Sequence, residues 1–336
     1  MDTDEKRVVL RDGRFLDHTG VAVPLICGPM YPCSNPELVA AVSAAGGLGV
    51  VQPVSLTFVH GCAFRAGLRR IRTLTECPIG FNALIENSSK RYLERMVQWV
   101  DVALEEGVRF FITSLGNPRW VVQRVVAAGG VVYHDVTEHK WAVKALDAGV
   151  QGLIAVNRRA GGHAGTHSEF ELLECLAEFD VPKICAGGIG SADQFAAAIE
   201  LGYAGCQLGT RFIATPECTA SAAYKQAIIA ACETDIVLSE RVTGVPVSII
   251  RTPNIAQQGL TAGPLARRLL QGPRTKHWMR LAYTLQSAWK LKRALFETAA
   301  GEAFWQAGKS AAAIDALEPA GAIVRRFGAR VGRGDP

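Results

Sequence analysis

Eight short apolar or β-branched runs alternate with longer helix-forming segments between Val23 and about Ala214, and this alternation limits the fold more than any other feature. Alternating strand and helix patterns are typical of βαβ units on a parallel sheet. Eight such units favour a closed (β/α)8 TIM barrel over an open doubly wound sheet. The expected strands are VPLICG (23–28), GLGVVQ (47–52), CPIGFN (77–82), VRFFITS (108–114), GVVYHDV (130–136), QGLIAVN (151–157), VPKICAG (181–187) and AGCQLG (204–209).

The helix-forming segments carry their own start and stop signals. NPELVAAVSAAGG begins with an asparagine cap and a first-turn proline, and it ends on glycine. The segments 89–107, 137–149 and 191–202 also end at a glycine able to take the left-handed cap conformation. After Phe212 the alternation stops. Residues 216 to 330 are expected to be mainly helical, and the aromatic-rich stretch 277–305 suggests a lid or second subdomain.

Charge and cysteine content exclude several classes of protein. The net charge of +5 comes largely from the C-terminal third, but no nucleic-acid motif accompanies it, so we expect a solvated helical face and no nucleic-acid partner. Nine scattered cysteines form no CxxC or Cys/His ligand pattern, so neither a metal site nor a disulfide framework is expected. No apolar run approaches the roughly 20 residues of a bilayer helix, and the first residues do not form a secretory signal. We therefore expect a cytoplasmic protein with no membrane partner.

Two glycine-bearing turns follow the seventh and eighth expected strands, where TIM barrels commonly hold phosphate. Gly187 and Gly188 in AGGIG leave backbone N–H groups open to an anion, and Gly209 and Thr210 in GTRF add a second set, with Arg211 as a candidate charge. The pair of turns predicts a phosphate site. A phosphate-sugar isomerase would use the same grip. No GxGxxG follows the first strand and no P-loop motif occurs.

The other strand ends carry groups suited to a flat ring. Gly28, Pro29 and Met30 end the first strand with stiff backbone and a thioether, although Met30 could equally plug the core. Asn82 ends the third strand and would hydrogen-bond a ring heteroatom.

The loop AGGHAGTH follows the sixth strand. Gly161 and Gly162 would let His163 approach a flat cofactor and exchange a proton, and a purely structural His163 is the alternative. For His167 a helix-capping role is preferred to a catalytic one, and for His134 that of a satisfied strand-end group.

The chain resembles the nitronate monooxygenase family, formerly called 2-nitropropane dioxygenases, in several motifs taken together. They are AGGHAG, AGGI and GTRF after these strands, an early PM, NPELVAAVSAAGGLG, a strand ending FN, and AGKSAAAI. The resemblance implies an FMN-binding TIM barrel over residues 1–215 and 305–336, with 216–304 as a mainly helical lid. It also implies His163 as the catalytic residue and a homodimer as a candidate assembly. The implied cofactor-binding residues are Gly28, Pro29, Met30, Asn82, Gly161, Gly162, Gly187, Gly188, Gly209 and Thr210.

The resemblance implies oxidation of an alkyl nitronate by dioxygen, giving a carbonyl compound and nitrite. Three departures from the family pattern bear on the substrate: Val156 replaces a glutamine, Arg159 replaces an acid, and Lys309 replaces the glutamine of AGQ. Arg158 and Arg159 would favour an anionic substrate at the entrance. The NAD(P)H:quinone reductases and the flavin enoyl-acyl-carrier-protein reductases, which share the barrel, are the alternatives. A further alternative is a barrel without catalytic activity that binds an acidic partner protein.

Overall fold

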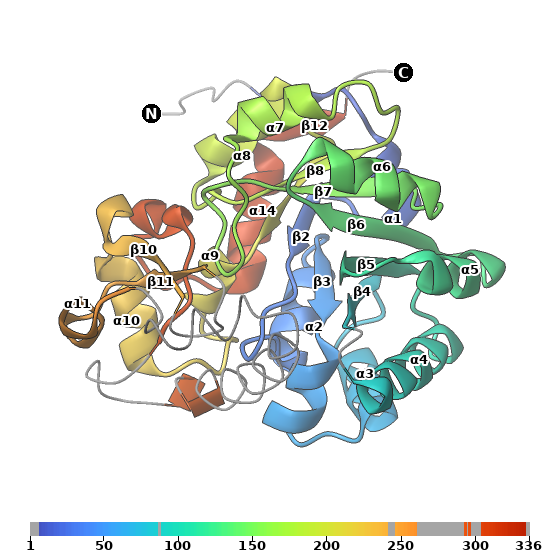
Figure 1. The fold of residues 1–336 in the computed structure, drawn as a ribbon, viewed down its shortest axis with the longest axis horizontal. Coiled ribbons are helices and arrows are strands. Elements are labelled where there is room, and N and C mark those ends of the chain that lie inside the picture. The colour runs from blue at the N-terminus through green and yellow to red at the C-terminus, as the bar shows by residue number, and fades with distance from the viewer. Residues whose placement is uncertain are drawn as a thin grey trace, which may run out of the picture.

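The chain folds around a closed barrel of eight parallel strands, β2 to β9, in sequence order (Figure 1). The structure, a computed structural model, describes residues 7–86, 89–240, 246–260, 292–293, 295–296 and 304–333. The eight predicted strands are confirmed. They are β2 (Leu25–Cys27), β3 (Leu48–Val51), β4 (Ile79–Ile85), β5 (Phe110–Leu115), β6 (Val131–Val136), β7 (Gly152–Val156), β8 (Lys183–Ala186) and β9 (Gly205–Leu208).

Helices surround the barrel and connect its strands. Asn35 stands at the N-cap position of α2 as predicted, with Pro36 in the first turn, but its side chain donates to Glu37 and to the Glu217 carbonyl and does not cap the helix. Ser191 caps α8 through a capping box with Gln194. The helices between strands are α2 (Pro36–Ala44), the π-helix η1 (Ser55–Val59), α3 (Phe64–Leu74), α4 (Lys90–Glu105), α5 (Arg119–Ala127), α6 (His139–Asp147), α7 (Glu169–Cys175) and α8 (Ala192–Leu201).

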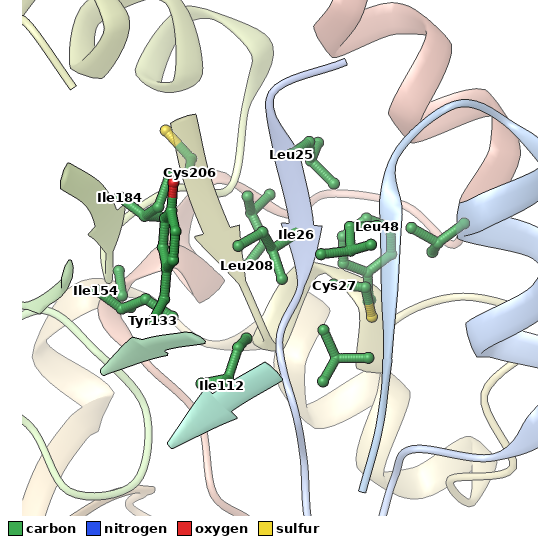
Figure 2. Close-up of a cluster of buried hydrophobic side chains, with 14 of the residues drawn as sticks. Leu25, Ile26, Cys27, Leu48, Ile112, Tyr133, Ile154, Ile184, Cys206 and Leu208 are labelled. Carbon is green, nitrogen blue, oxygen red and sulfur yellow. The ribbon is translucent and has the colours of Figure 1, made fainter. Parts of the chain in front are cut away.

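The barrel interior is filled by every second residue of each strand. A methyl group at Gly80 would meet the side chains of Leu48 and Phe110, and one at Gly152 would lie 2.3 Å from Cζ of Tyr133, so these positions share the inner face. Gly49, one residue after Leu48, instead faces the backbone of α2. Figure 2 shows Tyr133, Ile154 and Ile184 lying together on three neighbouring strands.

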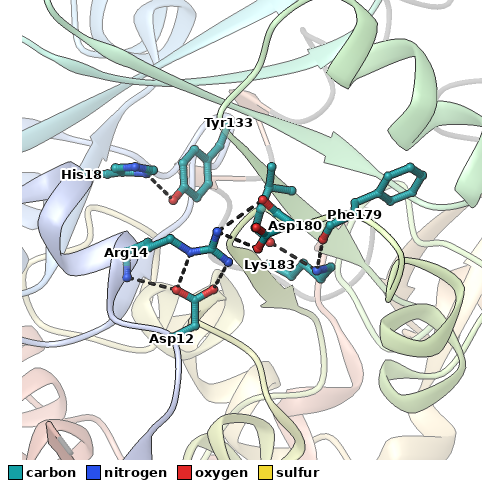
Figure 3. A network of polar contacts seen from close by, with 8 residues as sticks. Asp12, Arg14, His18, Tyr133, Phe179, Asp180 and Lys183 are labelled. Atoms are coloured by element: carbon teal, nitrogen blue, oxygen red, sulfur yellow. Dashed lines mark hydrogen bonds and ion pairs between the residues drawn. The ribbon is translucent and has the colours of Figure 1, made fainter. Parts of the chain in front are cut away.

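The amino-terminal end of the barrel is closed by α1 (Arg14–Thr19). Phe15 packs edge-on against Phe110 and Tyr133, and the Tyr133 hydroxyl lies 2.9 Å from Nδ1 of His18 (Figure 3). Arg14 beside this contact hydrogen-bonds both Asp12 and Asp180, which fixes α1 to the loop before β8. The open end of the barrel is therefore the carboxyl end of its strands.

The elements α10, β10, β11 and α11, which follow β9, lie beside the barrel in Figure 1. The strands β10 and β11 pair as an antiparallel hairpin in a region predicted to be mainly helical, because the β-branched run VSII pairs with IVLS from 236–239. The elements are α9 (Thr210–Ile213), α10 (Ala222–Ala230), the short 3-10 helix η2 (Glu233–Asp235), β10 (Ile236–Ser239), β11 (Val247–Ile250) and α11 (Pro253–Gln258). Most of the aromatic stretch 277–305 lies outside the described residues, and the division at 215 and 305 stays a prediction.

The C-terminal segment returns to the barrel. Trp305 stacks on Tyr224 of α10 with ring centroids 5.6 Å apart, and the Trp305 carbonyl accepts from the Ile250 N–H. The 3-10 helix η3 (Lys309–Ala313) and α14 (Ala320–Ala329) follow, and β12 (Val331–Arg333) pairs in parallel with β1 (Val8–Leu10). Within the described residues, no helix combines the length and apolar character needed to cross a membrane.

Candidate functional site

The turn after β8 exposes unpartnered backbone donors at the open end of the barrel. Gly187 and Gly188 have φ values of 119° and 81°, which side chains rarely adopt. A methyl group at Gly187 would lie 2.4 Å from Oδ1 of Asn157. The N–H groups of Gly187, Gly188 and Ile189 donate no hydrogen bond to any described residue. Such a run of free donors suits a bound anion.

The turn after β9 lies beside it, because β8 and β9 are neighbours in the barrel. Gly209 also donates no backbone hydrogen bond within the described chain, and the first N–H groups of α9 face the same edge. Thr210 is buried, and its hydroxyl accepts from the Gly308 N–H at 2.9 Å. Thr210 thus keeps its own hydroxyl proton for a ligand.

Arg211 does not supply the charge that the sequence suggested for this turn. Its guanidinium is 1% exposed, donates to the Ala316 carbonyl at 2.8 Å and lies 3.4 Å from Glu318. Because it is directed into the C-terminal segment, Arg211 fixes that segment to α9.

The loop after β7 is held from several sides. Asn157 is buried, accepts from the Arg159 N–H and donates to the Gly187 carbonyl, which links this loop to the β8 turn. Gly162 accepts from Ser248 of β11. A methyl group at Gly161 would lie 2.9 Å from the Gly308 nitrogen, so the loop and the C-terminal segment touch through bare backbone.

His163 stands in this loop, exposed on its surface, yet surrounded by enough protein to lower the pKa of its imidazole. A neutral imidazole can accept a proton. His167 does not cap α7, because Ser168 does so through a capping box with Glu171. His134 is satisfied, as expected: its Nδ1 lies 2.8 Å from the Thr113 hydroxyl, and burial lowers its pKa to about 4.

The end of β2 contributes a thioether beside the second glycine turn. Met30 is half-buried, and a methyl group at Gly209 would lie 3.4 Å from its Sδ. The Met30 N–H donates to the Ser34 hydroxyl at 2.9 Å, which fixes the Pro29–Met30 backbone. Gly28 is buried, and a methyl group there would lie 2.8 Å from Cγ of Gln207. The Gln207 side chain of β9 therefore packs directly on the bare backbone of Gly28, just after β2.

Three unpartnered oxygen atoms lie on inward-facing positions near the carboxyl ends of three strands. They are Oδ1 of Asn82, Oδ1 of Asp135 and Oε1 of Gln207, each buried without a hydrogen-bond partner in the described structure. Asn82 was predicted from the sequence, whereas Asp135 and Gln207 were missed. The signal that could have found them was a polar residue at an inward-facing position of a predicted strand. Buried oxygens without partners are rare, and they indicate groups that a ligand satisfies.

Two of the three family departures meet at one carboxylate. Arg159 hydrogen-bonds Glu233 of η2 through both terminal nitrogens, at 3.4 and 3.2 Å, and Nζ of Lys309 lies 3.4 Å from the same group. Arg158 lies 3.9 Å from Glu171. These carboxylates offset much of the positive potential expected at the entrance. Glu233 was missed by sequence analysis because it lies 74 residues from Arg159.

The third departure, Val156, ends β7 at an inward-facing position. It therefore adds an apolar group to the wall of the open end.

The family model for nitronate monooxygenase matches residues 14–328. The chain belongs to the nitronate monooxygenase family. It is accordingly an oxidoreductase of a flavin-dependent class.

Individual relatives differ in their activities. A (3aS,4S,5R,7aS)-5-hydroxy-7a-methyl-1-oxo-octahydro-1H-indene-4-carboxyl-CoA dehydrogenase from Rhodococcus jostii is 29% identical over 69% of this chain and 64% of its own length. A nitronate monooxygenase from Pseudomonas aeruginosa is 29% identical over 64% of this chain and 73% of its own. The structure of FabK from Thermotoga maritima superposes with a TM-score of 0.77 at 27% identity, covering 95% and 96% of the two chains.

Proposed function

We propose that the open end of the barrel binds FMN. The free N–H groups of Gly187, Gly188 and Gly209, with the Thr210 hydroxyl, would hold the phosphate. Pro29 and Met30 would contact the ring, and Asn82 would hydrogen-bond it. The backbone of Gly28, Gly161 and Gly162 would line the same space. The free N–H groups fit a phosphate, and the unpartnered oxygen atoms fit a ring with polar edges. Both features support FMN as the ligand of this site.

The reaction we propose is oxidation of an alkyl nitronate by dioxygen to a carbonyl compound and nitrite. FMN supplies the electron-accepting chemistry. His163, kept neutral by its lowered pKa, would remove the α-proton of a nitroalkane or orient the nitronate oxygen atoms. The observation that carries the proposal is the position of His163 on a loop that also contacts the β8 turn and the C-terminal segment.

A second candidate is dehydrogenation of a coenzyme A thioester. Two relatives, at 29% and 28% identity, carry that activity in their names. The largely neutralised arginines at the entrance also remove one argument for a small anionic substrate. A third candidate function is NAD(P)H-dependent reduction of a quinone or of an enoyl thioester.

Oxygen uptake by the purified flavin-loaded protein on adding propionate 3-nitronate, without NADH or NADPH, tests the proposal. Uptake with stoichiometric nitrite release is the expected result. Bound flavin with no uptake would contradict nitronate oxidation. Reduction of the flavin by NADH or NADPH under nitrogen would then support the reductases, and reduction by an acyl-CoA would support the thioester dehydrogenase.

A further inference from the structure

Asp135 is a carboxyl group directed into the open end of the barrel, with no part in the proposed function. It follows Tyr133 by two residues on β6, so the two side chains leave the same face of the strand. Tyr133 points into the barrel, where it contacts Phe15 and Phe110 at the closed end. Asp135 therefore occupies the next interior level, towards the open end.

The surroundings of this carboxyl are apolar or uncharged. Its partner across the β6–β7 ladder is Ile154, and the next inward residue of β7 is Val156. Burial alone raises the pKa of Asp135 to about 7, and no charged group contributes. The nearest titratable neighbours on its own strand do not compete, because burial raises the pKa of Tyr133 and His134 faces the opposite side with Thr113.

Asp135 also keeps an unused hydrogen-bonding position. Its Oδ1 is buried and unpartnered, as are the oxygens of Asn82 and Gln207 on other inward-facing positions. Of the three, Asp135 alone is ionisable, so it can present either an acceptor or an O–H donor. A ligand that fills the open end would remove the remaining water from the carboxyl and offer it a partner.

We propose that Asp135 is a second proton-carrying residue of the site, that its carboxyl contacts the ring of the bound flavin, and that ring binding makes this carboxyl take up one proton from solvent. The inference rests on the proposed FMN site but not on the proposed reaction. Desolvation favours the neutral acid, and the proton comes from water, so no oxidant or further reactant is involved.

Riboflavin binding to the apoprotein is the sharpest test, because riboflavin lacks a phosphate whose own ionisation near pH 6 would interfere. Between pH 7 and 8.5 the affinity of the parent protein should fall with rising pH, by up to about tenfold per pH unit for one linked proton. Asp135→Asn should bind with an affinity that does not change over this range. Asp147→Asn, at the exposed end of α6, is the matched control and should behave like the parent.

Proton uptake measured directly on the parent in weakly buffered solution at pH 7.5 makes the test independent of any variant's folding. Uptake of most of one proton per riboflavin, roughly three quarters because the carboxyl of the apoprotein is already partly protonated at pH 7.5, is the expected result, and Asp135→Asn should abolish it. Riboflavin bound with no proton uptake, or with the same pH dependence in Asp135→Asn as in the parent, would overturn the role of Asp135 and leave the flavin site standing. Failure of the parent to bind riboflavin or FMN would overturn both.

Discussion

Gly161 and Gly308 come from segments 147 residues apart, yet their backbones touch: a methyl group at Gly308 would lie 2.6 Å from the Gly161 nitrogen and 2.8 Å from the Arg159 carbonyl oxygen. The contact joins the loop carrying His163 to the C-terminal segment. The neighbouring hydrogen bonds, Gly308 N–H to the Thr210 hydroxyl and Lys309 N–H to the Arg159 carbonyl, make it a three-way junction at the candidate phosphate site.

Gly308→Ala should weaken flavin binding while leaving the barrel folded. Inserting a methyl group against fixed backbone costs about 1–3 kcal/mol, and the displacement falls on the binding loops. We expect FMN affinity, measured by fluorescence titration, to fall by roughly 5- to 150-fold. Gly13→Ala, where a methyl group meets nothing within 4 Å, should bind FMN as the parent does. Equal affinities in the two variants would refute the junction.

Glu233→Gln should tighten binding of FMN. The change leaves Arg159 and Lys309 without their shared carboxylate. Arg159 lies beside the candidate phosphate site, because a methyl group placed at Gly188 would lie 2.7 Å from its Nε. We expect the variant to bind FMN roughly two- to fivefold more tightly than the parent does, and to bind riboflavin with the same affinity as the parent. The gain for FMN should shrink at high salt. Arg159→Met should act in the opposite direction. A gain that extends equally to riboflavin would show that charge is not the cause.

His163→Asn should keep its flavin and lose turnover, by roughly 100-fold or more if proton transfer is the role of the imidazole. Because surrounding protein lowers the pKa of His163, the neutral form predominates at pH 7, and parent activity should fall only at more acidic pH. The pH–rate profile of kcat/KM on a neutral nitroalkane is the measurement. An acidic limb that persists in His163→Asn would assign that limb to another group.

Asp135→Asn should change how the stability of the apoprotein depends on pH. The pKa of Asp135 is raised from 3.8 to about 7 in the folded chain, so the folded state holds its proton more tightly, and the parent loses stability as pH rises from about 4 to 7. The loss attributable to this group is at most about 4 kcal/mol, at 1.4 kcal/mol per pKa unit. Urea unfolding at pH 5 and pH 8 should show a smaller decline in Asp135→Asn, and an unchanged decline would contradict the assignment.

Arg211→Ala should destabilise the fold by about 1–3 kcal/mol, because it removes a buried side chain and leaves the Ala316 carbonyl without its donor, while Glu318 keeps its ion pair with Arg326 at 2.7 Å. Urea unfolding followed by circular dichroism measures the change. Arg325→Ala, on the exposed face of α14, is the control and should cost less than about 0.5 kcal/mol. Equal stability of the two variants would mean that Arg211 is not a structural anchor.

The strands and the glycine turns could be predicted because their signals are local. A buried strand such as QGLIAVN and a turn such as AGGIG are recognisable within a few residues. The role of Asp135 was not predicted, because it depends on which alternate residues of β6 face the barrel interior. The packing of Tyr133 against Phe15 of α1 sets that choice. Glu233 and Gly308 act through contacts to residues far along the chain. The hairpin β10–β11 was missed because each of its strands has only four residues, and a run that short does not distinguish a strand from part of a helix.

The return of residues 306–309 to the barrel mouth has a consequence for biosynthesis. All eight barrel strands leave the ribosome before Gly308 is made, so a nascent chain can close its barrel about 100 residues before the junction with Thr210 and Gly161 exists. Capture of the proposed cofactor would then be a late event that depends on residues 306–309. A polypeptide released early would carry the barrel and the imidazole of His163 but an incomplete anion grip, and flavin occupancy would distinguish finished molecules from unfinished ones.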